Sequence, residues 1–276
     1  MTLVLLVALA VAQGAFVPQT AEERYVAGLR AQVAKGDVEA EVALGNLYEA
    51  GDVLPQDPKQ AAEWYRRAAN KGHSGAQLNL AMMYFDGEGV PRDAGQAVGW
   101  YEKAAANGEA IASLSLGSIY ETGAQRIRRD DTKAATWYRK AAEQGLGTAQ
   151  YRLAVMYRDG RGVRRDATEA ITWFRKAADR GEADAQIELG ILLSPGHSSS
   201  SDIIEAHTWF NLAASRWKDE AKRVQAGKLR DDLEKTMTPE QRAAAYRRAT
   251  EWQDSHSWPR QSAARPGTRD SGSGIR

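Results

Sequence analysis

Apolar residues along this chain follow the period of an amphipathic helix, and they do so in pairs of short segments. In residues 74–85, apolar positions recur at i, i+4, i+7 and i+8, namely Ala76, Leu80, Met83 and Tyr84, which marks one face of a helix. The sequence Gly-Glu-Gly-Val-Pro at 87–91 then interrupts the pattern, because glycine and proline disfavour helix continuation. A second apolar stripe follows Asp93. The pattern predicts two helices joined by a short loop.

This helix pair recurs at a fixed period. Tryptophan returns at spacings of 36, 37, 36 and 36 residues, at Trp64, Trp100, Trp137, Trp173 and Trp209. Aspartates open the second helices (Asp57, Asp93, Asp130, Asp166 and Asp202) and glycines follow their ends (Gly72, Gly108, Gly145 and Gly181). We expect each aspartate to cap its helix, worth about 1 kcal/mol, and each glycine to adopt a left-handed cap. Stacked pairs bury their apolar faces, so Trp137→Ala should cost about 3–5 kcal/mol.

The repeated unit resembles a known family. It reads Ala-x3-Leu-Gly/Ala-x2-Tyr-x2-Gly-x-Gly-Val-x2-Asp-x3-Ala-x2-Trp-Tyr/Phe-x-Lys-Ala-Ala-x2-Gly, most completely at 76–108 and 149–181, and is similar to the Sel-1-like repeat, a relative of the tetratricopeptide repeat. The resemblance covers about residues 40–214. It implies an all-α, right-handed α-solenoid of about five helix-turn-helix repeats of 36–37 residues. Repeat one lacks the second loop glycine, and repeat five has lost the tyrosine and the loop valine.

The sequence divides into five segments. Residues 3–12 are apolar and end in Ala-Val-Ala before Gln13, which predicts a signal peptide at 1–12, although no lysine or arginine precedes the run. An N-terminal segment with a capping helix follows at 13–39, then five repeats at 40–215. C-terminal capping helices are expected at 216–255, with Thr238 as an N-cap before Pro239. The tail at 256–276 has a composition typical of disorder.

The composition excludes several kinds of site and partner. The chain has no cysteine, which excludes disulfides and thiolate metal sites. With 37 basic and 36 acidic residues, its net charge is +1, which argues against nucleic acid as a partner. The histidines (His73, His197, His207 and His256) lack metal-ligand spacing, and we interpret them as surface or capping residues. No cofactor, metal site or membrane span after signal cleavage is expected.

Two groups of loop residues could serve binding instead of structure. Arg126, Arg128 and Arg129 lie in one repeat loop, and Arg161, Arg164 and Arg165 lie in the next. They could contact an acidic partner or anionic headgroups, or they could simply be solvated loop charges. The glycine-rich loops lack the lysine and serine or threonine of a phosphate-binding loop.

The resemblance to tetratricopeptide proteins also implies a binding face. In that superhelix the first helices line the concave side, and carrying the aligned positions over gives a candidate groove of thirteen residues: Asn46, Glu49, Leu78, Met82, Phe85, Leu114, Ser118, Glu121, Tyr151, Val155, Arg158, Ile187 and Ile191. An apolar floor with polar edges suits an amphipathic helix or an extended peptide. The alternative is that Leu78, Tyr151, Val155 and Ile187 pack between neighbouring first helices.

These observations favour a non-catalytic scaffold or adaptor that binds a protein or peptide, in the periplasm or secreted. From the resemblance, it could regulate a membrane sensor kinase or serve cell-envelope assembly. Two alternatives stay open, namely a hydrolase directed at cell walls or β-lactams and a secreted effector that binds host proteins. The relatives linked to such hydrolysis are cysteine-rich, and this chain is not.

Overall fold

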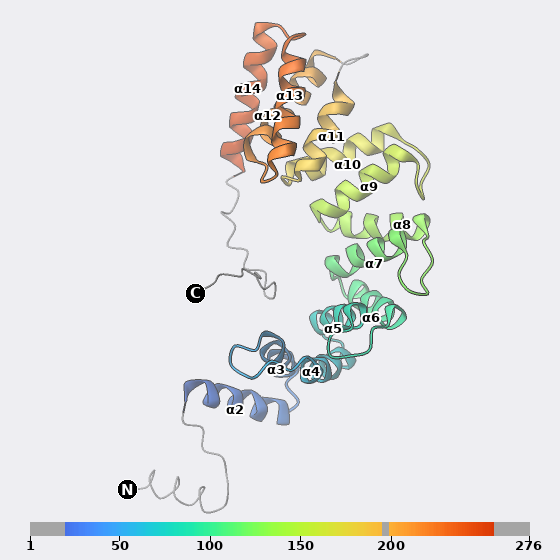
Figure 1. Cartoon of the computed structure of the whole chain (residues 1–276), viewed down its shortest axis with the longest axis vertical. Coiled ribbons are helices and arrows are strands. Elements are labelled where there is room, and N and C mark those ends of the chain that lie inside the picture. The colour runs from blue at the N-terminus through green and yellow to red at the C-terminus, as the bar shows by residue number, and fades with distance from the viewer. Residues whose placement is uncertain (1–19, 195–198, 257–276) are drawn as a thin grey trace, which may run out of the picture. The chain divides into compact units, whose positions relative to one another are not determined.

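A computed structural model describes residues 20–194 and 199–256, which form thirteen helices and no β-strand (Figure 1). The expected signal peptide and nearly all of the expected tail lie outside the described residues. The described chain divides into two compact units, residues 20–109 and 110–256. The all-α repeat architecture is confirmed in both units.

The first unit contains five helices, each packed mainly against its neighbours in chain order. They are α2 (Ala21–Ala34), α3 (Val38–Ala50), α4 (Pro58–Asn70), α5 (Ser74–Asp86) and α6 (Ala94–Ala106). Helix α2 packs on α3 as the expected N-terminal cap, with Val26 and Leu29 buried beside Leu44. Repeats one and two therefore each supply one helix pair.

The second unit contains repeats three to five and the C-terminal cap. Its helices are α7 (Ala110–Thr122), α8 (Asp131–Glu143), α9 (Gly147–Asp159), α10 (Ala167–Asp179), α11 (Ala183–Leu193), α12 (Ser200–Arg216), α13 (Glu220–Glu234) and α14 (Pro239–Ser255). Helix α12 packs against both α13 and α14, so these two helices cover the end of the repeat stack within this unit. Thr238 forms the expected capping box with Gln241.

The repeated aspartates act as N-caps in the first four repeats. Asp57, Asp93, Asp130 and Asp166 each accept backbone N–H bonds from the first turn of the helix that follows. Repeat five differs from the prediction. Asp202 is the third residue of α12, and Ser199 is the N-cap that forms a capping box with it. The serine-rich loop of this repeat supplies an earlier cap, so the helix begins before the aspartate.

The deepest side chains of the core are the aromatic residues that follow each tryptophan. Tyr65, Tyr138, Phe174 and Phe210 are almost completely buried. A glycine in the first helix of the same repeat makes room for the ring, because a Cβ at Gly117 would lie 2.5 Å from Tyr138 Cδ1. Equivalent contacts join Gly45 to Tyr65 and Gly190 to Phe210. The small residues of the repeat thus admit the ring that closes each helix pair.

The tryptophans differ in burial more than their regular spacing in the sequence suggests. Trp173 and Trp209 are buried in the core of the second unit, whereas Trp64, Trp100 and Trp137 are half-buried. Trp64 packs on the cluster of α2 and α3, and Trp100 packs on the cluster that includes Tyr65 and Leu80. The cost predicted for Trp137→Ala is therefore too high, because that side chain keeps part of its contact with solvent.

Glutamine side chains join successive repeats. The Nε2 atoms of Gln77, Gln150 and Gln186 donate to backbone carbonyls near the end of the preceding second helix, at 3.0–3.2 Å. In repeat one the equivalent position is Glu41, whose fully buried carboxylate lies 2.9 Å from Arg67 and 3.1 Å from Lys71. The three buried amide N–H groups are thereby hydrogen-bonded, and the buried Glu41 carboxylate is balanced by two cations.

Candidate functional site

The candidate groove residues of the first unit combine an apolar surface with a polar cluster. Met82 is 45% exposed on α5, and Leu78 and Phe85 on the same helix are half-buried. Asn46 and Glu49 on α3 are exposed. The hydroxyl of Tyr65 lies 2.7 Å from Asn46 Oδ1 and 2.6 Å from Glu49 Oε2. The two polar residues therefore hold a buried tyrosine as well as facing solvent.

Burial raises the pKa of the Tyr65 hydroxyl, and the neighbouring Glu49 carboxylate raises it further. The hydroxyl stays neutral and keeps donating its proton to the carboxylate. Replacement of Glu49 would remove the charged acceptor and leave the hydroxyl with the neutral Asn46 Oδ1, which lies 2.7 Å away.

In the second unit the groove residues form a chain of ion pairs. Arg161 Nη2 donates to Glu121 Oε1 at 2.8 Å, and Tyr138 donates to Glu121 Oε2 at 2.7 Å. Arg158 on α9 pairs with Glu188 on α11 at 2.7 Å. The first helices of repeats three to five are thus linked by charges along the expected face, where Ser118 is also exposed.

Hydrogen bonds determine the charge state of Glu121. Burial alone would raise the pKa of this carboxyl, but the bonds from Tyr138 and Arg161 outweigh burial and the pKa is lowered. The pKa of Arg158 is raised by its hydrogen bond to Asp159, and the bond to Glu188 adds to the effect. Both side chains therefore remain charged near neutral pH.

The apolar groove residues of this unit divide between core and surface. Leu114, Tyr151 and Val155 are half-buried against the core, as the packing alternative requires in part. Ile187 is only 6% exposed because it packs with Ala213 and Ala226 beneath α13. It is therefore unavailable to a partner, contrary to its place in the predicted groove.

One exposed apolar residue was missed by the sequence reasoning. Ile111 is 51% exposed on α7 and precedes Leu114 by three residues, so it shares that face of the helix. Ile111 lies near the start of α7, outside the leucine and tyrosine positions from which the groove was predicted. Its apolar side chain on the same helix face as Leu114 was the sequence signal that could have identified it.

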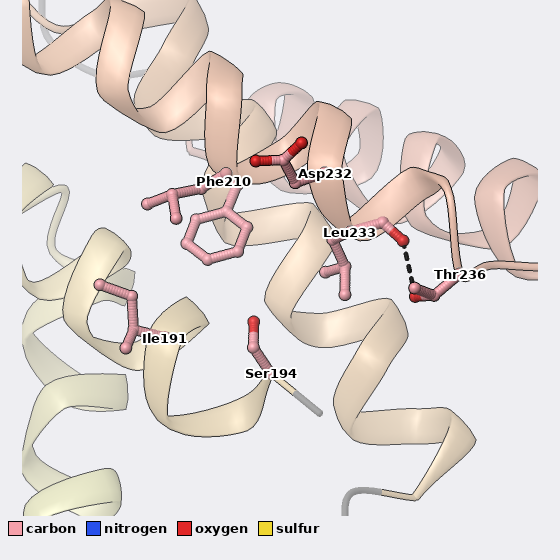
Figure 2. Close-up of a pocket in the computed structure, with 7 residues that line it drawn as sticks. Ile191, Ser194, Phe210, Asp232, Leu233 and Thr236 are labelled. Atoms are coloured by element: carbon pink, nitrogen blue, oxygen red, sulfur yellow. Dashed lines mark hydrogen bonds between the residues drawn. The ribbon is translucent and has the colours of Figure 1, made fainter. Parts of the chain in front are cut away.

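Ile191 borders a pocket between α11, α12 and α13 (Figure 2). The cavity of about 280 Å³ is lined by Ile191, Ser194, Phe210, Leu229, Asp232, Leu233 and Thr236. Figure 2 shows Ile191 and Leu233 on opposite sides of the Phe210 ring, with Asp232 and Thr236 at the α13 side. Ile191 is 45% exposed at its edge. The pocket offers an apolar interior with a few polar atoms, the composition of a side-chain binding site.

The histidines have structural roles in the described part of the chain. His73 caps α5 by accepting the Ala76 N–H, as expected. His207 is fully buried and lies 2.7 Å from Glu234, so the interpretation as a surface or capping residue was wrong for it. Its environment comes from α13 and α14, which lie outside the repeat pattern. His256 stacks on Trp252. Within residues 20–194 and 199–256, no cluster of three or more potential ligands could hold a metal ion.

Family comparison agrees with the helix pairs. A family model of the Sel1 repeat matches residues 38–73, 74–109, 110–146, 147–182 and 183–216. The chain belongs to the Sel1 repeat family. Sel1 repeat proteins are generally protein-interaction scaffolds and are typically non-catalytic. None of the helices in the described ranges is long and apolar enough to cross a membrane.

Two solved structures with Sel1-type repeats are similar to this chain. A protective antigen of uropathogenic Escherichia coli with an SLR fold is 29% identical, with a TM-score of 0.67 over 98% of this chain and 57% of that chain. A Sel1 repeat protein from Oxalobacter formigenes is 26% identical, with a TM-score of 0.60 over 71% of this chain and 88% of that chain. This chain thus spans little more than half of the antigen's length. No curated protein matches the sequence.

Proposed function

We propose that this protein is an exported, non-catalytic scaffold that binds a protein or peptide in the bacterial periplasm. The first helices α7, α9 and α11 of the second unit would hold the partner, and the pocket beside Ile191 would receive one apolar side chain. The observation that carries this proposal is the apolar pocket beside Ile191, which is 45% exposed on a first helix, because an apolar cavity with a few polar atoms suits a bound side chain.

The polar residues on these helices would supply specificity. Glu121 lies on the same helix as Ile111 and Glu188 on the same helix as Ile191, and Arg158 on α9 pairs with Glu188. A partner would bury its apolar anchor and must match these charges, because an unmatched buried charge costs several kcal/mol. A membrane sensor kinase or a component of cell-envelope assembly is the class of partner we favour.

Single aspartate substitutions test the binding face. We would introduce Ile191→Asp and, as a matched control, Val224→Asp on α13, where Val224 is 51% exposed away from the pocket. Tagged wild-type and variant chains would be used to purify partners from the envelope fraction. We expect a stoichiometric partner that is retained by the Val224 variant and lost by the Ile191 variant. Equal recovery by both variants would contradict the role of the pocket.

Export can be tested without knowing the partner. Residues 1–20 would be fused to alkaline phosphatase, which is active only outside the cytoplasm. Activity at the level of a known exported fusion supports the proposed compartment, whereas an inactive fusion excludes the periplasmic partners proposed above.

A further inference from the structure

The loops between the two helices of repeats one to four share one backbone design. Each loop begins with a glycine in the left-handed region, at φ values of 77°, 82°, 76° and 71°. Each loop ends at the capping aspartate, whose backbone N–H donates to the carbonyl of the periodic tyrosine of the same repeat at 2.8–3.0 Å. These contacts fix the ends of the loops. Between these contacts the loops differ in sequence, and the loop of repeat three is one residue longer.

The charge of these loops differs sharply between the units. In the first unit, residues 51–56 contain one acid and no basic residue, and residues 87–92 contain one acid and one arginine. In the second unit, residues 123–129 and 160–165 contain three arginines each and no acid. Repeats one and two form the same contacts at the two ends of the loop with at most one arginine, so these end contacts do not require the positive charge.

The two basic loops of the second unit adjoin each other. Gly162 packs so closely on the backbone of Asp131 that a Cβ would overlap the Asp131 carbonyl oxygen. The Asp131 side chain accepts two hydrogen bonds from Arg129, at 2.9 and 2.7 Å. Figure 1 shows the α7–α8 and α9–α10 loops on the same side of this unit. The six arginines therefore lie on two neighbouring loops.

Three of the six arginines make hydrogen bonds or ion pairs with other residues of the chain. Arg129 pairs with Asp131, Arg161 pairs with Glu121, and Arg165 Nε donates to a backbone carbonyl at 3.1 Å. Arg126 and Arg128 are exposed, as is Arg164, and none of these three makes a hydrogen bond or ion pair within the described chain.

The first loop holds its arginines on a fixed frame. Ala124 and Ile127 exchange two backbone hydrogen bonds, at 3.0 and 2.7 Å, and the Ile127 side chain is half-buried. Arg126 and Arg128, on either side of Ile127, thus project from a closed turn. Preorganisation of this kind lowers the entropy lost when a ligand binds.

We propose that Arg126, Arg128 and Arg164 form a docking surface for a short acidic segment of a protein partner. A guanidinium binds a carboxylate through two parallel hydrogen bonds, and three such groups match a segment with several aspartates or glutamates. The whole chain has a net charge of +1, so it lacks the broad field that would draw in nucleic acid or an anionic bilayer. This surface is independent of the pocket beside Ile191.

Two charge-matched triple variants test the surface. R126Q/R128Q/R164Q removes the three available arginines, and R223Q/K228Q/R247Q removes three exposed charges from α13 and α14. The probe is a fluorescein-labelled ten-residue peptide of alternating glutamate and serine, titrated at about 50 mM salt, where the Debye length is above 10 Å. We expect the loop variant to bind about tenfold more weakly, or about 1.4 kcal/mol, and the control variant to keep most of its affinity.

Two further probes distinguish an acidic peptide from an anionic membrane and from nucleic acid. Vesicles with one fifth phosphatidylglycerol and a single-stranded oligonucleotide with the charge of the peptide should bind less tightly and should not depend on the three arginines. Absence of peptide binding, equal losses in both triple variants, or arginine dependence confined to vesicles or oligonucleotide would overturn the proposal. Ile191→Asp should leave peptide binding unchanged, so this result is separate from the outcome for the pocket.

Discussion

A single methyl group added at Gly117 probes a close contact between α7 and α8 in the second unit. An alanine Cβ there would lie 2.5 Å from both Cδ1 and Cε1 of Tyr138, far inside van der Waals contact. The Tyr138 ring has little room to retreat, because it is 1% exposed and its hydroxyl is bound to Glu121. Either the ring must turn or α7 and α8 must separate.

The expected magnitude follows from two opposing effects. Overpacking of a dense core costs about 1–3 kcal/mol, whereas replacing glycine with alanine inside a helix gains up to about 1 kcal/mol. Because the overlap at Gly117 is severe, we expect the overpacking cost to be near the top of its range and the free energy of unfolding to fall by about 2 kcal/mol. Gly227→Ala is the matched control, because Gly227 lies inside α13 with no atom within 4 Å of the added Cβ.

The assay is urea unfolding followed by circular dichroism at 222 nm and by tryptophan fluorescence. Gly117→Ala should lower the unfolding midpoint, and Gly227→Ala should raise it. In a Tyr138→Leu background, the cost of Gly117→Ala should shrink or reverse, because the ring that it strikes is gone. A Gly117→Ala protein as stable as the wild type, with an unchanged denaturant dependence, would refute the packing argument.

Three further predictions concern the second unit. Gly162→Ala should cost about 2 kcal/mol or more in urea unfolding, because its φ is 68° and a Cβ would overlap a carbonyl oxygen of α8. Trp173→Ala should lower the melting temperature more than Trp137→Ala, because Trp173 is buried, and thermal unfolding should show at least a twofold difference between the shifts. Burial raises the pKa of Glu205, but the hydrogen bonds from Arg175 and Trp209 together with the nearby positive charges outweigh burial, and the pKa is lowered on folding. Stability from this group is therefore complete above its unfolded pKa and is lost as pH falls through the lowered folded pKa, so an unfolding series should show a weaker acid loss for Glu205→Gln.

The sequence predicted the repeat because the repeat leaves a periodic signal. Glycine, aspartate and tryptophan recur at one spacing, and the glycines and aspartates have local roles at helix ends that do not depend on distant residues. Capping of the first four second helices followed directly from this pattern. Asp202 does not cap its helix, because the second helix of repeat five begins earlier, at the N-cap Ser199, which has no counterpart in the other repeats.

Positions covered by helices outside the repeat could not be predicted in this way. Ile187 has the place of an exposed groove residue in the repeat, yet α13 covers it. His207 is buried through contacts with Glu234 and Tyr246, which belong to the capping helices. A period identifies what the repeats share, and it carries no information about where a non-repeated helix lies on them.

The core and the candidate face are also coupled, which limits the residues that can test binding. In repeats one and three, the glutamate on the first helix accepts a bond from the buried tyrosine hydroxyl. In repeat four the buried ring is Phe174, which has no hydroxyl, and the glutamate is replaced by Arg158, which pairs with Glu188 in the next repeat. In these three repeats the residue on this face thus matches the chemistry of the buried ring. A loss of binding after substitution of Glu49 or Glu121 would mix a structural defect with a lost contact, whereas substitution of Ile191 leaves these buried hydrogen bonds in place.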